Sequence, residues 1–226
     1  MLSVKPVPRI LEGHTVRLEP LTLAHVPDLF RAGGGDEEVW RWLNHPMPRT
    51  EAELREIVAG QLADEAKEAI LWAAVLRETG RAVGQTSYLD ISVRDERLEI
   101  GGTWYGRQVW RTAVNTEAKL LLLTHAFEDL GVGRVQWKTH HLNARSQEAI
   151  ARLGAHREGV LRRHMAMPDG TWRDSVYYSM LADEWPPARD RLKRRLAAGG
   201  EGAAAGAAGA GSPGDTSTEH ASHAAV

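Results

Sequence analysis

The chain contains no cysteine, which excludes thiol nucleophiles, cysteine-ligated zinc and disulfide frameworks together. It also has no apolar run of about 18 residues, the length that a membrane-spanning helix needs. The first residues, 1–6, lack the apolar segment of a signal peptide. Neither acids nor bases dominate, and the formal net charge of −2 weighs against a nucleic-acid binder, which needs a basic surface. We therefore expect a cytoplasmic protein with no membrane or nucleic-acid partner.

Hydrophobic residues make up 42% of the 226 residues and charged residues 26%, which is typical of a soluble globular protein. The composition changes after Leu196, where alanine and glycine dominate and aromatic residues are missing. Such a segment buries too little apolar surface to offset its chain entropy. We predict one domain over residues 1–196 and a disordered tail over residues 197–226. His220 and His223 in that tail have metal-like spacing, but we expect no metal site.

Hydrophobic periodicity predicts strands that alternate with helices along the domain. Strands are expected at residues 15–18, 70–76, 83–91, 97–105, 134–139, 160–164 and 175–181. Helices are expected at residues 23–32, 50–63, 116–130, 144–153 and 187–196. Three nearly consecutive strands in the middle of the chain indicate a mixed α/β or α+β sheet rather than a doubly wound one.

The segment 101–119 is the one most suggestive of chemistry. A strand ends, a loop turns, and a helix is expected to begin at about Asn115, a favourable N-cap residue. The first turn of a helix has unpaired N–H groups and a partial positive charge, so it suits a pyrophosphate. Arg107 and Arg111 lie in the loop and can donate to phosphate oxygens. Taken alone this signal is weak, because most capped helices bind nothing.

A series of short motifs follows in order over roughly residues 10 to 190. The motifs are Leu18-Glu19-Pro20-Leu21, Leu98-Glu99-Ile100-Gly101, Thr116-Glu117-Ala118, Asn143-x-x-Ser146, Arg152-Leu153-Gly154-Ala155, Glu158-Gly159-Val160-Leu161-Arg162, and Asp169-Gly170 before Arg173-Asp174. In this order they resemble the GNAT superfamily of N-acetyltransferases, and within it the RimJ/RimL type of ribosomal-protein N-terminal acetyltransferase. Each motif is weak by itself, whereas the ordered set is specific.

The resemblance implies an α+β fold with a strongly bent mixed sheet, splayed central strands and flanking helices. Acetyl-CoA, the co-substrate of the family, would lie in that splay. The residues implied to bind it are Trp104, Tyr105, Arg111, Thr112, Ala113, Val114, Asn115, Thr116 and Asn143. One departure concerns the family's phosphate loop, whose two glycine positions fall within residues 110–115, where this sequence has no glycine.

Direct attack of an amine in a ternary complex requires no protein nucleophile, which suits a chain without cysteine. The resemblance assigns Ser146 to the departing CoA sulfur; the alternative is that this serine simply caps or lies on a short helix. Asn143 would orient the pantetheine arm, cap a helix, or do both. A backbone N–H on the splayed central strand would donate to the oxyanion.

The sequence leaves the identity of the general base open. The family's catalytic tyrosine position falls at about Ile150, and a glutamate position of RimL-like enzymes falls near Met165. The candidates that remain are Glu99 acting through a water, His164, the pair His140 and His141, or water chains without a side chain. Each of these side chains also has a structural or surface interpretation.

The acceptor entrance of the family corresponds to residues 36–46. Trp40 and Trp42 there would form either a wall for the acceptor or ordinary core. The acids Asp36, Glu37 and Glu38 would attract a cationic acceptor or form a solvated face.

We therefore predict an N-acetyltransferase that moves an acetyl group from acetyl-CoA to a primary amine, on a protein N-terminus or a small molecule. The alternative is a non-catalytic acyl-CoA-binding or regulatory module. A third hypothesis, nucleic-acid binding by the basic segment 189–195, is disfavoured by the net charge. The resemblance also suggests a homodimer.

Overall fold

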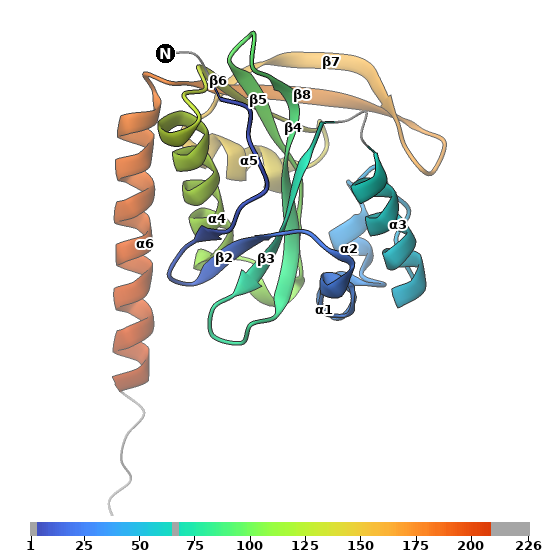
Figure 1. The fold of residues 1–226 in the computed structure, drawn as a ribbon, viewed down its shortest axis with the longest axis horizontal. Coiled ribbons are helices and arrows are strands. Elements are labelled where there is room, and N and C mark those ends of the chain that lie inside the picture. The colour runs from blue at the N-terminus through green and yellow to red at the C-terminus, as the bar shows by residue number, and fades with distance from the viewer. Residues whose placement is uncertain (1–3, 65–67, 209–226) are drawn as a thin grey trace, which may run out of the picture.

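The computed structural model describes residues 4–64 and 68–208. Its strands form one eight-stranded mixed sheet with the order β1-β2-β3-β4-β5-β6-β8-β7 (Figure 1). The strands are β1 (Leu11–Glu12), β2 (Val16–Pro20), β3 (Ile70–Leu76), β4 (Ala82–Ser92), β5 (Arg97–Tyr105), β6 (Arg134–His140), β7 (His156–Ala166) and β8 (Trp172–Leu181). Neighbouring strands are antiparallel except for the parallel pair β5 and β6. The predicted α+β class is confirmed.

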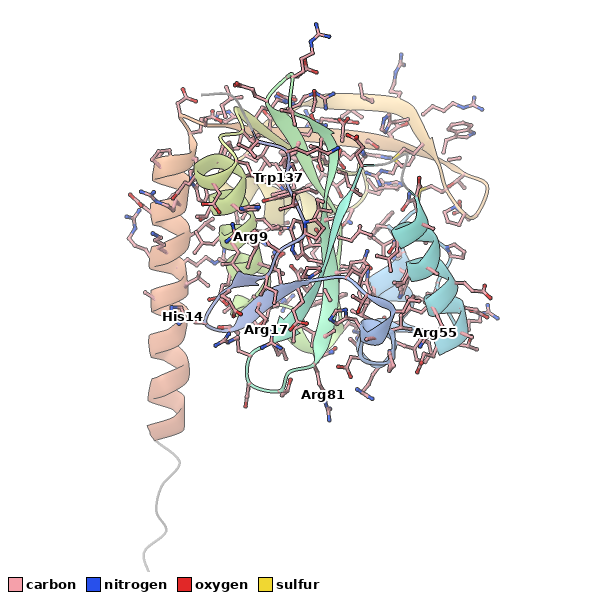
Figure 2. The ribbon with its side chains drawn as sticks, in the orientation of Figure 1. Arg9, His14, Arg17, Arg55, Arg81 and Trp137 are labelled. Carbon is pink, nitrogen blue, oxygen red and sulfur yellow. The ribbon has the colours of Figure 1, made fainter. Side chains whose placement is uncertain are left out.

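Helices cover both faces of this sheet (Figure 1). They are α1 (Val26–Gly33), α2 (Glu37–Trp40), α3 (Glu51–Ala63), α4 (Ala113–Thr124), α5 (Ala144–Leu153) and α6 (Trp185–Ala208). One apolar core lies between the sheet and α4, α5 and α6, and a second lies between the sheet and α1, α2 and α3. Figure 2 marks the two sides with His14, on the turn from β1 to β2, and Arg55, on α3. The sheet lies between these two cores, and its strands position the candidate site.

The central strands β5 and β6 separate soon after they meet. Their pairing covers three residue pairs, from Arg97 with Arg134 to Glu99 with Gln136. Beyond that point β5 continues to Tyr105 and β6 to His140 without pairing to each other. An irregularity in the β4–β5 register and a positive φ of 59° at Gly102 accompany the separation. The predicted splay is therefore present.

Several expected helix boundaries were wrong. The helix expected to begin at Leu23 starts as α1 at Val26, and the helix expected to reach Leu130 ends at Thr124 and continues as a π-helix over His125–Asp129. The helix expected at about Asn115 begins at Ala113, because Thr112 has extended backbone and its Oγ1 accepts from the Val114 N–H at 3.4 Å. The terminal helix begins at Trp185 and continues to Ala208, past the predicted boundary at Leu196. Seven of the residues 197–208 are alanine, the strongest helix former, and they favour continuation of the helix, whereas the four glycines there disfavour it. The rest of the predicted tail, including His220 and His223, lies outside the described residues.

Within residues 4–64 and 68–208, no helix combines the length and the apolar character that a membrane crossing requires. Over the same residues, no group of three or more His, Asp or Glu side chains is arranged to hold a metal ion.

Glu117, in the first turns of α4, is a structural residue. Its carboxylate accepts from the backbone N–H groups of His14, Thr15 and Val16, each at 2.8 Å. His14 and Thr15 lie on the turn between β1 and β2, Val16 begins β2, and all three are far from Glu117 in sequence. The carboxylate thus fastens the edge of the sheet to α4, and its place in the Thr116-Glu117-Ala118 motif reflects folding rather than chemistry.

Glu117→Gln is expected to lower the free energy of unfolding by about 1–3 kcal/mol. The amide oxygen of glutamine can still accept a hydrogen bond, but its N–H₂ group would face backbone N–H donors without an acceptor. Urea denaturation measures this loss. Glu56→Gln, at an exposed position of α3, is the matched control and should leave stability nearly unchanged. Equal stability of the two variants would contradict the structural role of Glu117.

Arg111, which directly precedes the N-cap of α4, has a φ of +63°. This left-handed conformation favours glycine, because a Cβ atom there is crowded by the neighbouring backbone. The two glycine positions of the family's phosphate loop correspond to Ala113 and Asn115, which both lie inside α4. The positive φ of Arg111 therefore lies outside those two positions.

Arg111→Gly is expected to be more stable than Arg111→Ala by about 0.5–1 kcal/mol, because both variants remove the same charge while only glycine relieves the positive φ. Thermal or chemical denaturation of the two variants side by side measures this difference. If the alanine variant were as stable as the glycine variant, the backbone at this residue would not be strained.

Candidate active site

Each of the two separated strands continues into the N-terminus of a helix, and we call these two segments the arms of the candidate site. On one arm, β5 continues through a loop into the N-terminus of α4. On the other, β6 continues through a short turn into the N-terminus of α5. Two helix N-termini, each with unpaired N–H groups and a partial positive charge, thus follow directly from the strands that separate.

The arm at α4 has the features of an anion-binding site. Arg107 and Arg111 are both exposed on the loop that precedes the helix. Thr112 is exposed, Val114 is buried, and Ala113, Asn115 and Thr116 are half-buried, so the predicted binding segment lies at the surface only at its start. Arg107 also forms an ion pair of 3.7 Å with Asp36. The positive charge of this arm is therefore concentrated just before α4.

The arm at α5 begins with Asn143. Its Oδ1 accepts from the Ser146 N–H at 3.1 Å, so Asn143 caps the helix. Ser146 is the third residue of α5 and half-buried. Ile150, at the position where the resemblance expects a tyrosine, is buried in the apolar core. The capping interpretation of Asn143 is thus confirmed, whereas its contact with a ligand stays a prediction.

A contact between Arg145 and Trp110 joins the two arms. The guanidinium carbon of Arg145, on α5, lies 3.6 Å from the centre of the Trp110 ring, on the loop before α4. Trp110 Nε1 donates to the Tyr105 carbonyl oxygen at 2.7 Å, which holds the indole beside the end of β5. Burial lowers the pKa of Arg145, an effect that the nearby Glu38 and Asp36 oppose. Sequence reasoning missed this pair, because its members belong to different motifs.

Polar side chains gather on the other face of the sheet, where α1, α2 and α3 lie. Glu99 of β5 is only 1% exposed, and its Oε2 is 2.8 Å from Lys138 Nζ of β6. Next to this pair, His164 Nδ1 lies 3.0 Å from Ser175 Oγ, and Tyr177 Oη lies 3.4 Å from His164 Nε2. The predicted residues Glu99 and His164 therefore belong to one polar cluster.

Electrostatics couples the members of this polar cluster. The pKa of His164 is lowered chiefly by burial and further by Lys138 and Arg173, while Glu99 acts in the opposite direction. Burial likewise lowers the pKa of Arg173, whose Nε donates to Ser175 Oγ at 3.0 Å. Sequence reasoning missed Lys138, Arg173 and Tyr177, although the alternation along β6 and β8 places all three on the face of Glu99.

The two predicted acceptor tryptophans occupy different surroundings. Trp40 is buried, lies 5.4 Å from the Trp104 ring, and donates from Nε1 to the Gly33 carbonyl oxygen at 2.7 Å. Trp42 is half-buried, and its ring lies 4.7 Å from that of His140. The pKa of His140 is lowered, first by burial and then by the adjacent His141 and by Arg173. Trp42 therefore extends the polar cluster, whereas Trp40 belongs mainly to the core.

A groove of about 570 Å³ opens between α2 and the turn from β7 to β8. Its lining includes Glu37, Glu38, Trp40, Arg41, Met167 and Asp169. Three carboxylates against one guanidinium make this part of the lining acidic. Asp36, the other acid predicted to attract an acceptor, instead accepts from the Glu38 N–H at 3.1 Å and pairs with Arg107.

Comparison with known proteins agrees with this arrangement. The family model described as the acetyltransferase (GNAT) domain matches residues 15–156. The uncharacterised N-acetyltransferase YoaA of Bacillus subtilis (strain 168) is 24% identical over 172 residues, which cover 76% of this chain and 96% of YoaA.

Solved structures give the same result. A structure from T. thermophilus, described as a "putative acetyltransferase", shares 42% identity with a TM-score of 0.78, and the match covers 84% of this chain and 98% of that one. A GCN5-related N-acetyltransferase from Brucella melitensis shares 30% identity with a TM-score of 0.81, over 86% of this chain and 88% of that one. The separated central strands, the motif order and these matches together show that the chain belongs to the GNAT family of acetyltransferases.

Proposed function

We propose that this acetyltransferase moves an acetyl group from acetyl-CoA to a primary amine by direct attack in a ternary complex. The observation that carries the proposal is the opening between β5 and β6, which has a positively charged arm on one side and a buried polar cluster with an acidic groove on the other. An anionic donor and a cationic acceptor would thus approach from opposite sides.

The residues present fit acetyl-CoA, which supplies an activated acetyl thioester. The β5 edge up to Trp104 and Tyr105 is not paired to β6, so it can pair with the amides of a pantetheine arm. The start of α4 and the preceding arginines can hold a pyrophosphate. On the opposite arm, Asn143 and the stacked Arg145 flank the same opening.

Side chains of this protein would attract the acceptor amine, accept its proton and stabilise the leaving sulfur. Glu37, Glu38 and Asp169 attract a cationic amine to the groove. Within the polar cluster, the carboxylate of Glu99 is balanced by its ion pair with Lys138. His164 is proposed to accept the amine's proton, because its lowered pKa leaves the imidazole neutral at pH 7. Ser146 is proposed to donate a hydrogen bond to the departing sulfur.

The acceptor is proposed to be of the RimJ/RimL class, a protein N-terminus, or a small primary amine. The ordered motifs support this assignment, since Asn143 and Ser146 stand together at the start of α5 as the resemblance implies. The acidic groove supports an amine that arrives as a cation.

The proposed activity is tested by incubating the full chain with acetyl-CoA and a panel of peptides with free N-termini, amino acids and polyamines, while release of free thiol is followed. At least one amine is expected to be acetylated, with acetyl-CoA binding visible by calorimetry. Binding without turnover on any amine would instead support a non-catalytic acyl-CoA-binding module. Failure to bind acetyl-CoA at all would refute both.

Ser146→Ala is expected to lower kcat about 10- to 100-fold, the loss that corresponds to one hydrogen bond to a developing charge. Acetyl-CoA affinity, measured by calorimetry, should change little, because the serine acts on the leaving sulfur. Ser92→Ala removes a hydroxyl at the far end of β4 and is the matched control. Unchanged turnover of Ser146→Ala would show that the hydroxyl has no chemical role.

A further inference from the structure

Lys119, on the sheet-facing side of α4, is a buried amine. The residue is only 5% exposed, and its Nζ donates to Thr103 Oγ1 at 2.8 Å and to Thr86 Oγ1 at 3.3 Å. Burial lowers the pKa of this amine to about 7. Among the side chains that the structure describes, no carboxylate lies within ion-pair distance of Nζ.

The two threonines lead from Lys119 to the backbone of β5. Thr86 Oγ1 and Thr103 Oγ1 are 2.8 Å apart, and Thr103 Oγ1 donates to the Gly101 carbonyl oxygen at 3.4 Å. On the other face of the sheet, Ser87 Oγ donates to the same Gly101 oxygen at 2.7 Å. The Gly101 carbonyl is therefore held from both faces, at the irregularity where β5 leaves β6.

The held carbonyl determines where the next amide points. The chain has no cis peptide bond among the described residues, so the Gly102 N–H points opposite to the Gly101 carbonyl oxygen. Since Ser87 of β4 holds that oxygen, the Gly102 N–H is directed away from β4. That direction is the open edge of β5, which faces the opening between the separated strands.

The amine holds the Thr103 hydroxyl in place. Each threonine oxygen can accept two hydrogen bonds, and Lys119 supplies one of them to each. Thr103 Oγ1 can also accept from Thr86 while its own proton donates to the Gly101 carbonyl oxygen. The 2.8 Å bond from Nζ thus fixes the position of the hydroxyl that reaches Gly101.

We propose that Lys119 is a positioning residue for acetyl transfer: through Thr103 it fixes the Gly101–Gly102 peptide so that the Gly102 N–H donates to the thioester carbonyl oxygen. This inference rests on the proposed function. Folding alone gives no reason for a lysine here, since a buried amine without a carboxylate is costly and the two threonines can satisfy each other. An apolar side chain of similar length would fill the same space without that cost.

The test compares the full-length protein with Lys119→Met, using acetyl-CoA labelled with ¹³C at the carbonyl and isotope-edited infrared spectroscopy. The unaltered protein is expected to shift the thioester carbonyl stretch to lower frequency on binding, because an N–H donor polarises the bond. Lys119→Met should bind acetyl-CoA with similar affinity, lose most of that shift, and show a kcat about tenfold lower with an amine accepted by the unaltered protein. Its melting temperature should be equal or higher.

Two further variants make the outcome decisive. Thr103→Val keeps the lysine but removes the hydroxyl that reaches Gly101, so it should reproduce the loss of the infrared shift. Leu121→Met changes the packing of α4 by a similar side chain and should preserve both the shift and kcat.

A full carbonyl shift and unchanged kcat in Lys119→Met would overturn the proposal. Equal losses of the infrared shift and of kcat in Leu121→Met would also overturn it. The same holds if Lys119→Met has a lower melting temperature while Thr103→Val keeps the full shift and kcat. Either outcome indicates a packing role alone. Failure of the proposed function is recognised separately, since the unaltered protein would then bind no acetyl-CoA or acetylate no amine.

Discussion

The early end of the β5–β6 pairing is the constraint on which the rest of this structure depends. Three parallel residue pairs hold the strands together, and beyond Glu99 each strand keeps a partner on its outer side only. Unpaired backbone groups inside a fold are costly, so an opening of this kind requires a partner or solvent. Two side-chain contacts span the separation, Glu99 with Lys138 where it begins and Arg145 with Trp110 between the arms.

Charge is distributed unequally on the two sides of this opening. The arginines before α4 and the N-termini of α4 and α5 make one side positive, whereas the groove beside α2 is acidic. The polar cluster lies between them, and burial lowers the pKa of both His140 and His164 within it. In the proposed reaction, the positive side would attract the donor and the acidic groove the acceptor, and the two regions meet where Glu38 of the groove lies near Arg145.

Much of the fold could be predicted because it depends on local patterns. Alternating and helical periodicities identified the main strands and helices, and capping, one of the two roles predicted for Asn143, is confirmed. The start of α4 was wrong because Thr112 and Asn115 are both acceptable caps, and only the extended backbone at Thr112 decides between them. The expected end of the last helix was wrong because the helix continues through residues 197–208, where alanines favour it despite four glycines.

The sequence by itself determined the order of the elements, the absence of a thiol nucleophile, and the motif order that indicated the family. Only the tertiary structure brought Glu99 to Lys138, Arg145 to Trp110, and Lys119 to Thr86 and Thr103. The members of each contact lie on different elements, and their proximity follows from sheet order and helix packing. Periodicity along a single segment records which face a side chain occupies, but it contains no information about which distant side chain occupies the space opposite.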